Sequence, residues 1–158
     1  MKPVPHVKDF MNRKIVILDP ETPMGEVAKL LLKKKVQGGA VVDGEGRFLG
    51  TVSAQGVMNA LLDFAHDEAP HGPAKGYLDP ESPTITEETS LLAAAEIFVR
   101  RGPELWAIPV MRDDRIVGAV YRLDVIGAVM EYVAGIEDRK AQTLYISALK
   151  EIDEKPPW

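Results

Sequence analysis

The sequence predicts an α/β (α+β) protein made of two similar β-α-β-β-α halves related by a pseudo-two-fold axis. Short segments of the first half recur in the second half about 67 residues later. Thr22-Pro23-Met24 matches Thr89-Ser90-Leu91, and Arg47-Phe48-Leu49-Gly50 matches Arg115-Ile116-Val117-Gly118. A repeat of this length indicates that the functional unit is a pair of similar halves with a cleft between them.

The composition narrows the class of protein. The chain has 158 residues, 46% hydrophobic and 27% charged, as in an ordinary globular protein. The net charge of −5 and the lack of a basic stripe argue against a nucleic-acid partner. The absence of cysteine excludes disulfides and thiol catalysis. No apolar run approaches the ~20 residues of a membrane span and no signal-peptide core is seen, so we expect a cytoplasmic protein without membrane contact.

The first strand and helix of each half are predicted from an apolar run and a helical stripe. Residues 15–18 form the apolar run, Thr22 is the expected N-cap, and Pro23 takes the first helical position. The apolar residues that follow have helical spacing and are matched in the second half. The two stripes are Met24, Val27, Ala28 and Leu31, and Leu91, Ala94, Ala95 and Phe98.

A β-hairpin and a second helix complete each half. In the first half, residues 40–42 and 48–52 flank a glycine-containing turn, and a helix follows at about 54–65. The second hairpin joins residues 108–111 to 116–120, and its helix covers about 122–133. Gly44-Glu45-Gly46 lacks the third glycine of a dinucleotide fingerprint, so we interpret it as a turn.

The connecting segments carry weaker signals. Lys33-Lys34-Lys35 ends a predicted helix and most simply complements its dipole. Residues 63–73 form a linker, in which two histidines and two acids could ligate a metal. Two histidines without a fixed scaffold seldom make a site, so we predict a solvated linker and no metal. The candidate ligands in this linker are His66, Asp67, Glu68 and His71.

Residues 134–158 lie outside the repeat and predict an amphipathic helix followed by a tail. The helix either packs back on the module or makes a subunit contact. Its apolar face contains Ala141, Leu144, Tyr145, Ala148, Leu149 and Ile152.

Each half resembles a CBS domain, named after cystathionine β-synthase, and the chain resembles a stand-alone tandem pair, or Bateman module. The matching blocks are residues 7–11, the strand-and-cap blocks 16–24 and 83–91, the Val-Val-Asp-Gly hairpin at 41–44, and a Gly-apolar-x-Thr/Ser-x-x-Asp block before each last helix. The resemblance implies a first domain at 7–62, a linker at 63–73, a second domain at 74–133, and a C-terminal helix and tail at 134–158.

The resemblance implies a ligand site rather than a reaction, because related modules bind adenine nucleotides or S-adenosylmethionine between the two halves. The Thr/Ser of the last block lies at a helix N-terminus, which favours phosphate. The Asp of that block binds the ribose hydroxyls, and apolar residues of the first two strands enclose the adenine. In the second half these apolar residues are Ile85, Ala107, Ile108 and Pro109.

Carried over residue by residue, the two sites differ. The first half keeps Ser53 but has Gly56 where the ribose Asp is expected. The second half keeps Asp124, has Tyr121 in place of the small hydroxyl residue, and has Arg122 near enough to meet a phosphate. The first-strand Thr of the family is kept as Thr84 and replaced by Ile17 in the first half. The second cleft is therefore the predicted ligand site.

Each of these residues also has a structural interpretation. Ser53 is an excellent helix N-cap without any ligand, and Asp124 in the first helical turn is favoured by the dipole. Tyr121 could fill the cleft itself. Trp106 is interpreted as a core or dimer contact rather than an adenine platform.

Two functions follow. The first is a regulatory module that senses an adenosine-containing ligand, either AMP, ADP, ATP or S-adenosylmethionine. The second is a CBS pair without a ligand that acts as a dimerisation or docking scaffold for an unidentified protein partner. We do not expect an enzyme, because no nucleophile–base pair, metal spacing or phosphate loop is found. The resemblance also implies a homodimer joined through helices, in a flat, disk-like arrangement.

Overall fold

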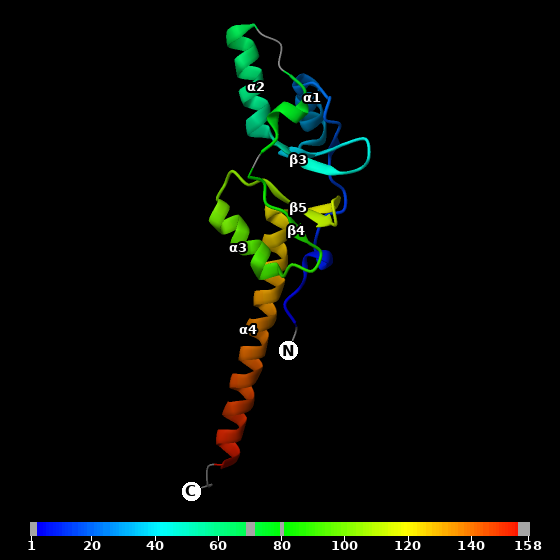
Figure 1. The fold of residues 1–158 in the computed structure, drawn as a ribbon. Helices are drawn as coiled ribbons and strands as arrows, with labels where there is room; N and C mark the ends of the chain where they lie inside the picture. Colours follow the sequence, from blue (N-terminus) through cyan, green and yellow to red (C-terminus); the bar gives the residue numbers. More distant parts are fainter. Residues whose placement is uncertain (1–2, 69–71, 80, 155–158) are drawn as a thin grey trace.

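The computed structural model describes residues 3–68, 72–79 and 81–154 of the chain. It contains two three-stranded sheets of the same order, each with two α-helices. Figure 1 shows the two sheets facing each other in the middle of the molecule, with α1 and α2 beyond one sheet and α3 and α4 beyond the other. The predicted pair of β-α-β-β-α halves is therefore confirmed.

The elements of the first half run in the predicted order. They are β1 (Ile17–Leu18), α1 (Met24–Lys34), β2 (Gly38–Val42), β3 (Phe48–Ser53) and α2 (Ala54–Asp67). Strand β1 pairs in parallel with β2, which pairs antiparallel with β3. The apolar stripe of α1 is buried against this sheet in one core.

The second half repeats this topology. Its elements are β4 (Ile85–Thr86), α3 (Leu91–Arg101), β5 (Ala107–Arg112), β6 (Arg115–Tyr121) and α4 (Arg122–Glu154). Each antiparallel pair carries a register shift at the same point of the repeat, between Val41 and Val42 and between Val110 and Met111. The stripe of α3 lies in a second core, so both predicted stripes have the same environment.

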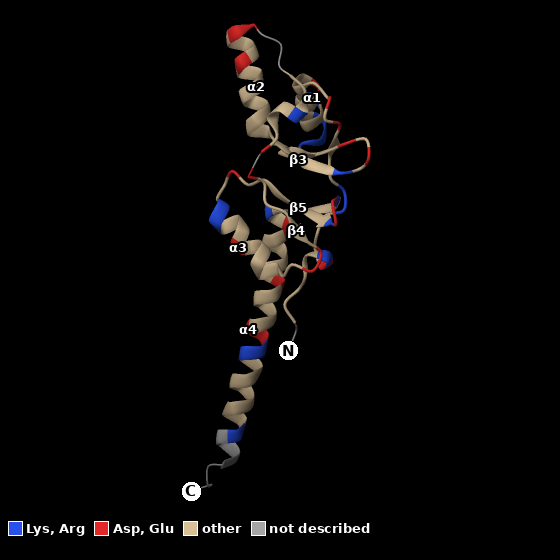
Figure 2. Cartoon of the chain, viewed as in Figure 1, with Lys and Arg blue, Asp and Glu red and all other residues tan. Residues whose placement is uncertain are grey.

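The predicted cap of α1 is wrong by one residue. The helix begins at Met24 with Pro23 in the N-cap position. Thr22 is not the cap, and its carbonyl instead accepts the backbone N–H of Ala74 at 2.8 Å. In α3 the corresponding cap is Ser90, whose hydroxyl accepts the N–H of Ala93 at 3.2 Å. The basic last turns of α1 and α3 complement the helix dipoles, as the blue end of α3 shows in Figure 2.

The first short element of each half packs on the other half. The 3-10 helix η1 (Val7–Asp9) joins the core of the second half through Val7, which is fully buried. The backbone N–H of Val7 donates to the carbonyl of Thr89 at 2.8 Å. In the same way η2 (Ala74–Tyr77) contributes Ala74 to the core of the first half. Neither half therefore completes its core from its own continuous segment.

The two hairpin turns meet at one end of the paired sheets. The N–H of Phe48 donates to the carbonyl of Asp114 at 3.1 Å. The guanidinium of Arg115 donates to the carbonyl of Glu45 at 3.1 Å. These bonds hold the halves together at the turns, away from the ends of β3 and β6 where the two last helices begin.

The last helix differs from the prediction. We expected one helix at about 122–133 and another beyond 134, but α4 continues without a break and extends away from the sheets (Figure 1). Gly135 does not interrupt it, because one glycine costs a helix only about 1 kcal/mol. Every residue from 141 to 150 is exposed, so this part of the helix does not pack back on the module.

Candidate functional site

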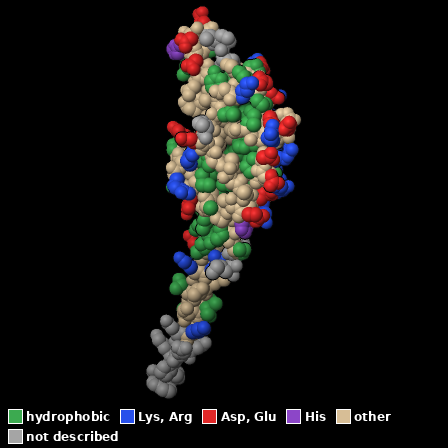
Figure 3. Space-filling model, in the orientation of Figure 1, with side chains coloured by type: hydrophobic (Ala, Val, Ile, Leu, Met, Phe, Trp, Pro, Cys, Tyr) green, Lys and Arg blue, Asp and Glu red, His purple; other side chains and the backbone are tan. Residues whose placement is uncertain are grey.

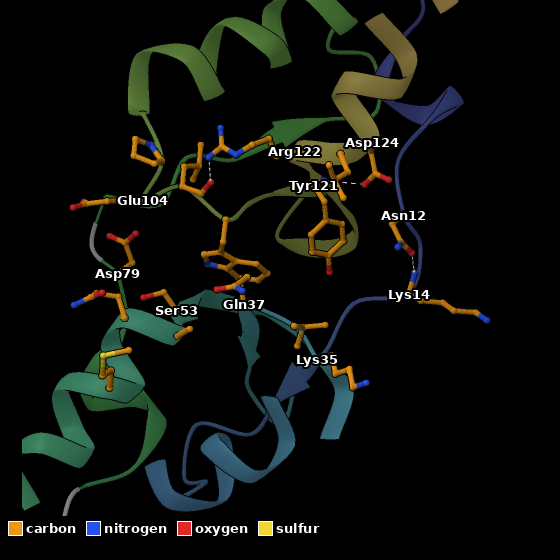
Figure 4. Close-up of a pocket in the computed structure, with 18 residues that line it drawn as sticks. Asn12, Lys14, Lys35, Gln37, Ser53, Asp79, Glu104, Tyr121, Arg122 and Asp124 are labelled. Carbon is orange, nitrogen blue, oxygen red and sulfur yellow. Dashed lines mark hydrogen bonds between the residues drawn. The ribbon is translucent and has the colours of Figure 1, made fainter. Parts of the chain in front are cut away.

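A cavity of about 1030 Å³ lies between the two halves. Figure 4 shows its lining residues, which come from both repeats. The β3–α2 corner contributes Ser53, and the β6–α4 corner contributes Tyr121 and Asp124. The segments that enter each half contribute Asn12 and Asp79. The cavity is thus built from equivalent parts of the repeat.

The entry segments are fixed by matching backbone bonds to the opposite half. Asn12 and Ala119 exchange two backbone hydrogen bonds of 2.9 Å. The N–H of Asp79 donates to the carbonyl of Thr51 at 2.8 Å. Each entry segment therefore lies along the last strand of the other half, beside the corner where the last helix begins.

Four of the predicted site residues line this cavity, namely Ser53, Tyr121, Arg122 and Asp124. The other five are absent from its lining. Ile85 and Ile108 belong to the core of the second half, and Ala107 and Pro109 are buried within β5. Thr84 is exposed just before β4. The structure thus brings together the residues at the corners where α2 and α4 begin, and leaves the residues in and just before β4 and β5 outside the lining.

The two helix corners are capped in complementary ways. The hydroxyl of Ser53 accepts the backbone N–H of Gly56 at 3.1 Å, at the start of α2. At the start of α4, the carboxylate of Asp124 accepts the backbone N–H of Tyr121 at 2.9 Å. A complete capping box has both kinds of bond at the start of one helix. Here α2 has only the bond to the side chain of its N-cap residue, Ser53. Helix α4 has only the bond from the backbone of its N-cap residue to the side chain of its third residue, Asp124. Both side chains have the structural role that the sequence left open.

Arg122 is held by the protein rather than left free at the rim. Its guanidinium donates to the carbonyls of Leu105 at 2.7 Å and Gly102 at 3.1 Å. Its charge also lies 5.1 Å from the centre of the Phe98 ring, at cation–π distance. Arg122 therefore fixes the loop between α3 and β5, a contact that the sequence analysis missed.

Trp106 lines the cavity, which the interpretation as a core or dimer contact missed. Its ring centre lies 6.1 Å from that of Tyr121 at 50°, a tilted aromatic pair. A side chain at Gly38 would bring a Cβ within 2.5 Å of Trp106, so glycine makes room for the indole. The sequence held no independent signal for this, because Gln37, which precedes β2 as Trp106 precedes β5, is known to line the cavity only from the structure.

Tyr121 is half-buried in this wall. Burial, and then the negative charge of Asp124, raise the pKa of its phenol above the ordinary value. The phenol therefore stays protonated at neutral pH and offers a hydroxyl to the cavity.

A smaller cavity of about 250 Å³ adjoins the Ser53 side and shares Asp79, Glu104 and Trp106 with the first. Thr51, almost fully buried, donates from its hydroxyl to the Ser82 hydroxyl at 3.2 Å in this wall. Among the described residues, no cluster of three histidine or acidic side chains is placed to hold a metal. His71, one of the candidate metal ligands of the linker, lies outside the described residues. Within the described chain, no helix has the length and hydropathy to cross a membrane.

Comparison with known proteins gives matches over most of the chain. The model of the CBS domain matches residues 7–63 and 74–131. The A-adding tRNA nucleotidyltransferase of Aquifex aeolicus is 27% identical over 125 residues, which are 79% of this chain and 14% of that enzyme. The chain therefore spans about a seventh of this curated relative.

Solved structures with a similar fold include CBSX2 and the CBS domain pair of MJ0100. CBSX2 of Arabidopsis thaliana, in complex with AMP, has a TM-score of 0.70 and 22% identity, covering 81% of this chain and 98% of that one. The CBS domain pair of MJ0100, in complex with 5′-methylthioadenosine and S-adenosylmethionine, has a TM-score of 0.67 and 21% identity, with coverage of 84% and 98%.

Proposed function

This chain belongs to the CBS domain family, as a tandem pair, and from that premise we propose that it is a regulatory module that senses an adenosine-containing ligand. The ligand occupies the cavity between the halves, at the corner of β6 and α4. AMP, ADP, ATP and S-adenosylmethionine are the candidate ligands.

The observation that carries this proposal is the position of Asp124 in the wall of a large cavity. Its carboxylate lies at a helix N-terminus beside the Trp106–Tyr121 pair, so an acidic acceptor and two aromatic rings face one space. A carboxylate can accept hydrogen bonds from two ribose hydroxyls, and aromatic rings suit a purine. The folds of CBSX2 and MJ0100, which were solved with AMP and with S-adenosylmethionine, support the same ligand class. Roles for Thr84, Ile85, Ala107, Ile108 and Pro109 stay predictions.

Thermal melting with each candidate ligand tests the proposal. A ligand at a hundredfold excess over its dissociation constant raises the free energy of unfolding by about 2.7 kcal/mol. Asp124→Ala should remove most of this gain, because each hydrogen bond to a charged acceptor contributes roughly 1.5–3 kcal/mol. Asp124→Asn is the matched control, since its amide oxygen can still cap α4. We expect Asn to melt near the wild type without ligand and to respond weakly to it. The proposal fails if no adenosine compound shifts the melt.

The second candidate function is a scaffold without a ligand. It is favoured by the capping bond of Asp124, which uses one carboxylate oxygen, and by Gly56, which offers no side chain to a ribose. The apolar helix surface supports a homodimer, since Met58, Leu61 and Met130 are exposed on α2 and α4. Figure 3 shows hydrophobic side chains spread over the visible face of the paired domains and along α4. A melt that no adenosine compound shifts, together with a stable dimer, would favour this function.

A further inference from the structure

Apart from Asp124 and Arg122, the charged side chains that line the cavity form a basic group and an acidic group. In Figure 4, Asn12 and Lys14 lie on one side of Tyr121, while Asp79 and Glu104 lie on the other. Lys14 follows the entry segment that pairs with β6, and Lys35 ends α1 below Tyr121 in the same view. Both lysines line the cavity, on the side of Asp124.

The two lysines are available to a ligand. Both side chains are exposed, and neither ammonium takes part in an ion pair with any residue of the described chain. Lys35 has a left-handed backbone conformation (φ 54°) that ends α1 at the cavity, so its position is fixed by the cap of the helix. Its neighbours Lys33 and Lys34 do not line the cavity.

The opposite end of the cavity is acidic. Asp79 and Glu104 line both the large cavity and the smaller adjoining one, where Glu81 joins them. Arg101 is the one cation among the described residues that line the smaller cavity. A phosphate at this end would meet three carboxylates, against the guanidinium of Arg101 and that of Arg122, which already donates to two carbonyls of the adjoining loop. Repulsion therefore outweighs attraction there.

Resting on the proposed function, we infer that the ligand is an anionic adenine nucleotide whose phosphates lie between Lys14 and Lys35. The ribose then lies at Asp124, and the acidic end stays free of phosphate. This orientation favours ATP and ADP over AMP, and AMP over adenosine. It disfavours S-adenosylmethionine, whose sulfonium and ammonium groups would face the lysines. The ligand class is thus set by two lysines that the family motif does not contain.

Calorimetric titration of adenosine, AMP, ADP, ATP and S-adenosylmethionine, without Mg²⁺, tests the inference. The variant is Lys14→Gln/Lys35→Gln. Its matched control is Arg13→Gln/Lys34→Gln, which removes the same charge from adjacent exposed residues outside the lining. We expect the variant to weaken ATP binding roughly tenfold, as two exposed charge pairs together can, and to leave adenosine binding unchanged. The control should bind ATP as the wild type does. Added salt should weaken ATP binding in the wild type more than in the variant.

The outcomes separate this inference from the proposed function. If adenosine binds as tightly as ATP, or S-adenosylmethionine binds more tightly than ATP, the lysines do not select the ligand and the inference is overturned while ligand sensing stands. An equal loss in variant and control would show a general effect of net charge and would also overturn it. If none of the five compounds binds, ligand sensing itself fails.

Discussion

The carboxylate of Asp124 accepts the backbone N–H of Tyr121 at 2.9 Å, which closes the first turn of α4 at the wall of the cavity. The acceptor proposed for a ribose is therefore already oriented by the backbone before a ligand arrives. A side chain fixed in this way loses little conformational freedom on binding, so pre-organisation favours affinity. Because the same carboxylate caps α4 and is proposed to bind the ribose, a change at Asp124 should affect both the stability of α4 and ligand binding.

Ser53→Ala should lower the free energy of unfolding by ~1 kcal/mol, because the hydroxyl that accepts the N–H of Gly56 is lost from the start of α2. The gain in stability from a nucleotide should persist, since the ligand is proposed to bind at the other corner. Urea denaturation with and without ATP measures both quantities. Loss of the ATP effect in this variant would place the ligand at the Ser53 corner.

Tyr121→Thr tests whether the phenol ring obstructs the ligand or stacks on it. The ring is half-buried beside Trp106, and threonine restores the small hydroxyl residue of the family motif. Because the Trp106–Tyr121 pair is proposed to face the purine, we expect weaker nucleotide binding in this variant, whereas tighter binding would show that the ring obstructs the ligand. Calorimetric dissociation constants separate the two, and an unchanged constant would remove Tyr121 from the site.

The stability of the protein should fall at alkaline pH through Tyr121. Its pKa is raised above the ordinary value of 10.0 in the folded state, so the folded protein holds the phenolic proton more tightly than the unfolded chain. This contribution is fully present below pH 10 and is lost as pH rises through the raised pKa. Tyr121→Phe should therefore show a shallower decline in unfolding free energy as pH rises above about 10. Parallel curves for the two proteins would contradict the shift.

Val7→Ala should destabilise the protein by about 2 kcal/mol, because it removes buried methyl groups from a packed core. Hydrogen exchange should show the loss of protection in α3 and β5, in the second half. The control is Val99→Ala, at an exposed position of α3, which should stay within about 0.5 kcal/mol of the wild type. Loss of protection confined to β1 and β2 would argue against the exchanged packing of η1.

Sedimentation should show a homodimer at micromolar concentration. Ile126 and Met130 of α4 are 48% and 68% exposed, whereas Val125 of the same turn is buried in the core. An apolar helix face of this kind favours association over exposure to water. Met130→Lys should shift the population toward monomer by placing a charge in that surface. A monomeric wild type would exclude the dimer.

Much of the fold could be predicted because each element predicted in one half could be compared with its equivalent in the other half. The stripe beginning at Met24 recurs at Leu91, so one helical pattern confirms the other, and the two sheets follow from the hairpins between them. The bond from Val7 to Thr89 could not be predicted, because backbone hydrogen bonds leave no side-chain pattern in the sequence. The continuity of α4 was missed because the end of the repeat suggested the end of a helix, whereas α4 continues past it.

The candidate site was predicted where function depends on a motif and missed where it depends on packing. Asp124 and Ser53 belong to recurring blocks, and the structure places both at the cavity. Lys35 was assigned to the helix dipole, because only the three-dimensional fold shows that the end of α1 faces the β6–α4 corner. Trp106 was missed because its environment depends on the glycine at position 38, far away in the sequence.

The exchange of Val7 and Ala74 between the cores has a consequence for how such a chain can arise. Two separate copies of one ancestral repeat, each lending its first turn to the other, would form the same contacts as a symmetric pair. Joining them end to end needs only a connecting segment and no repacking of either core. Within one joined chain the two copies can then differ, as they do at Gly56 and Asp124.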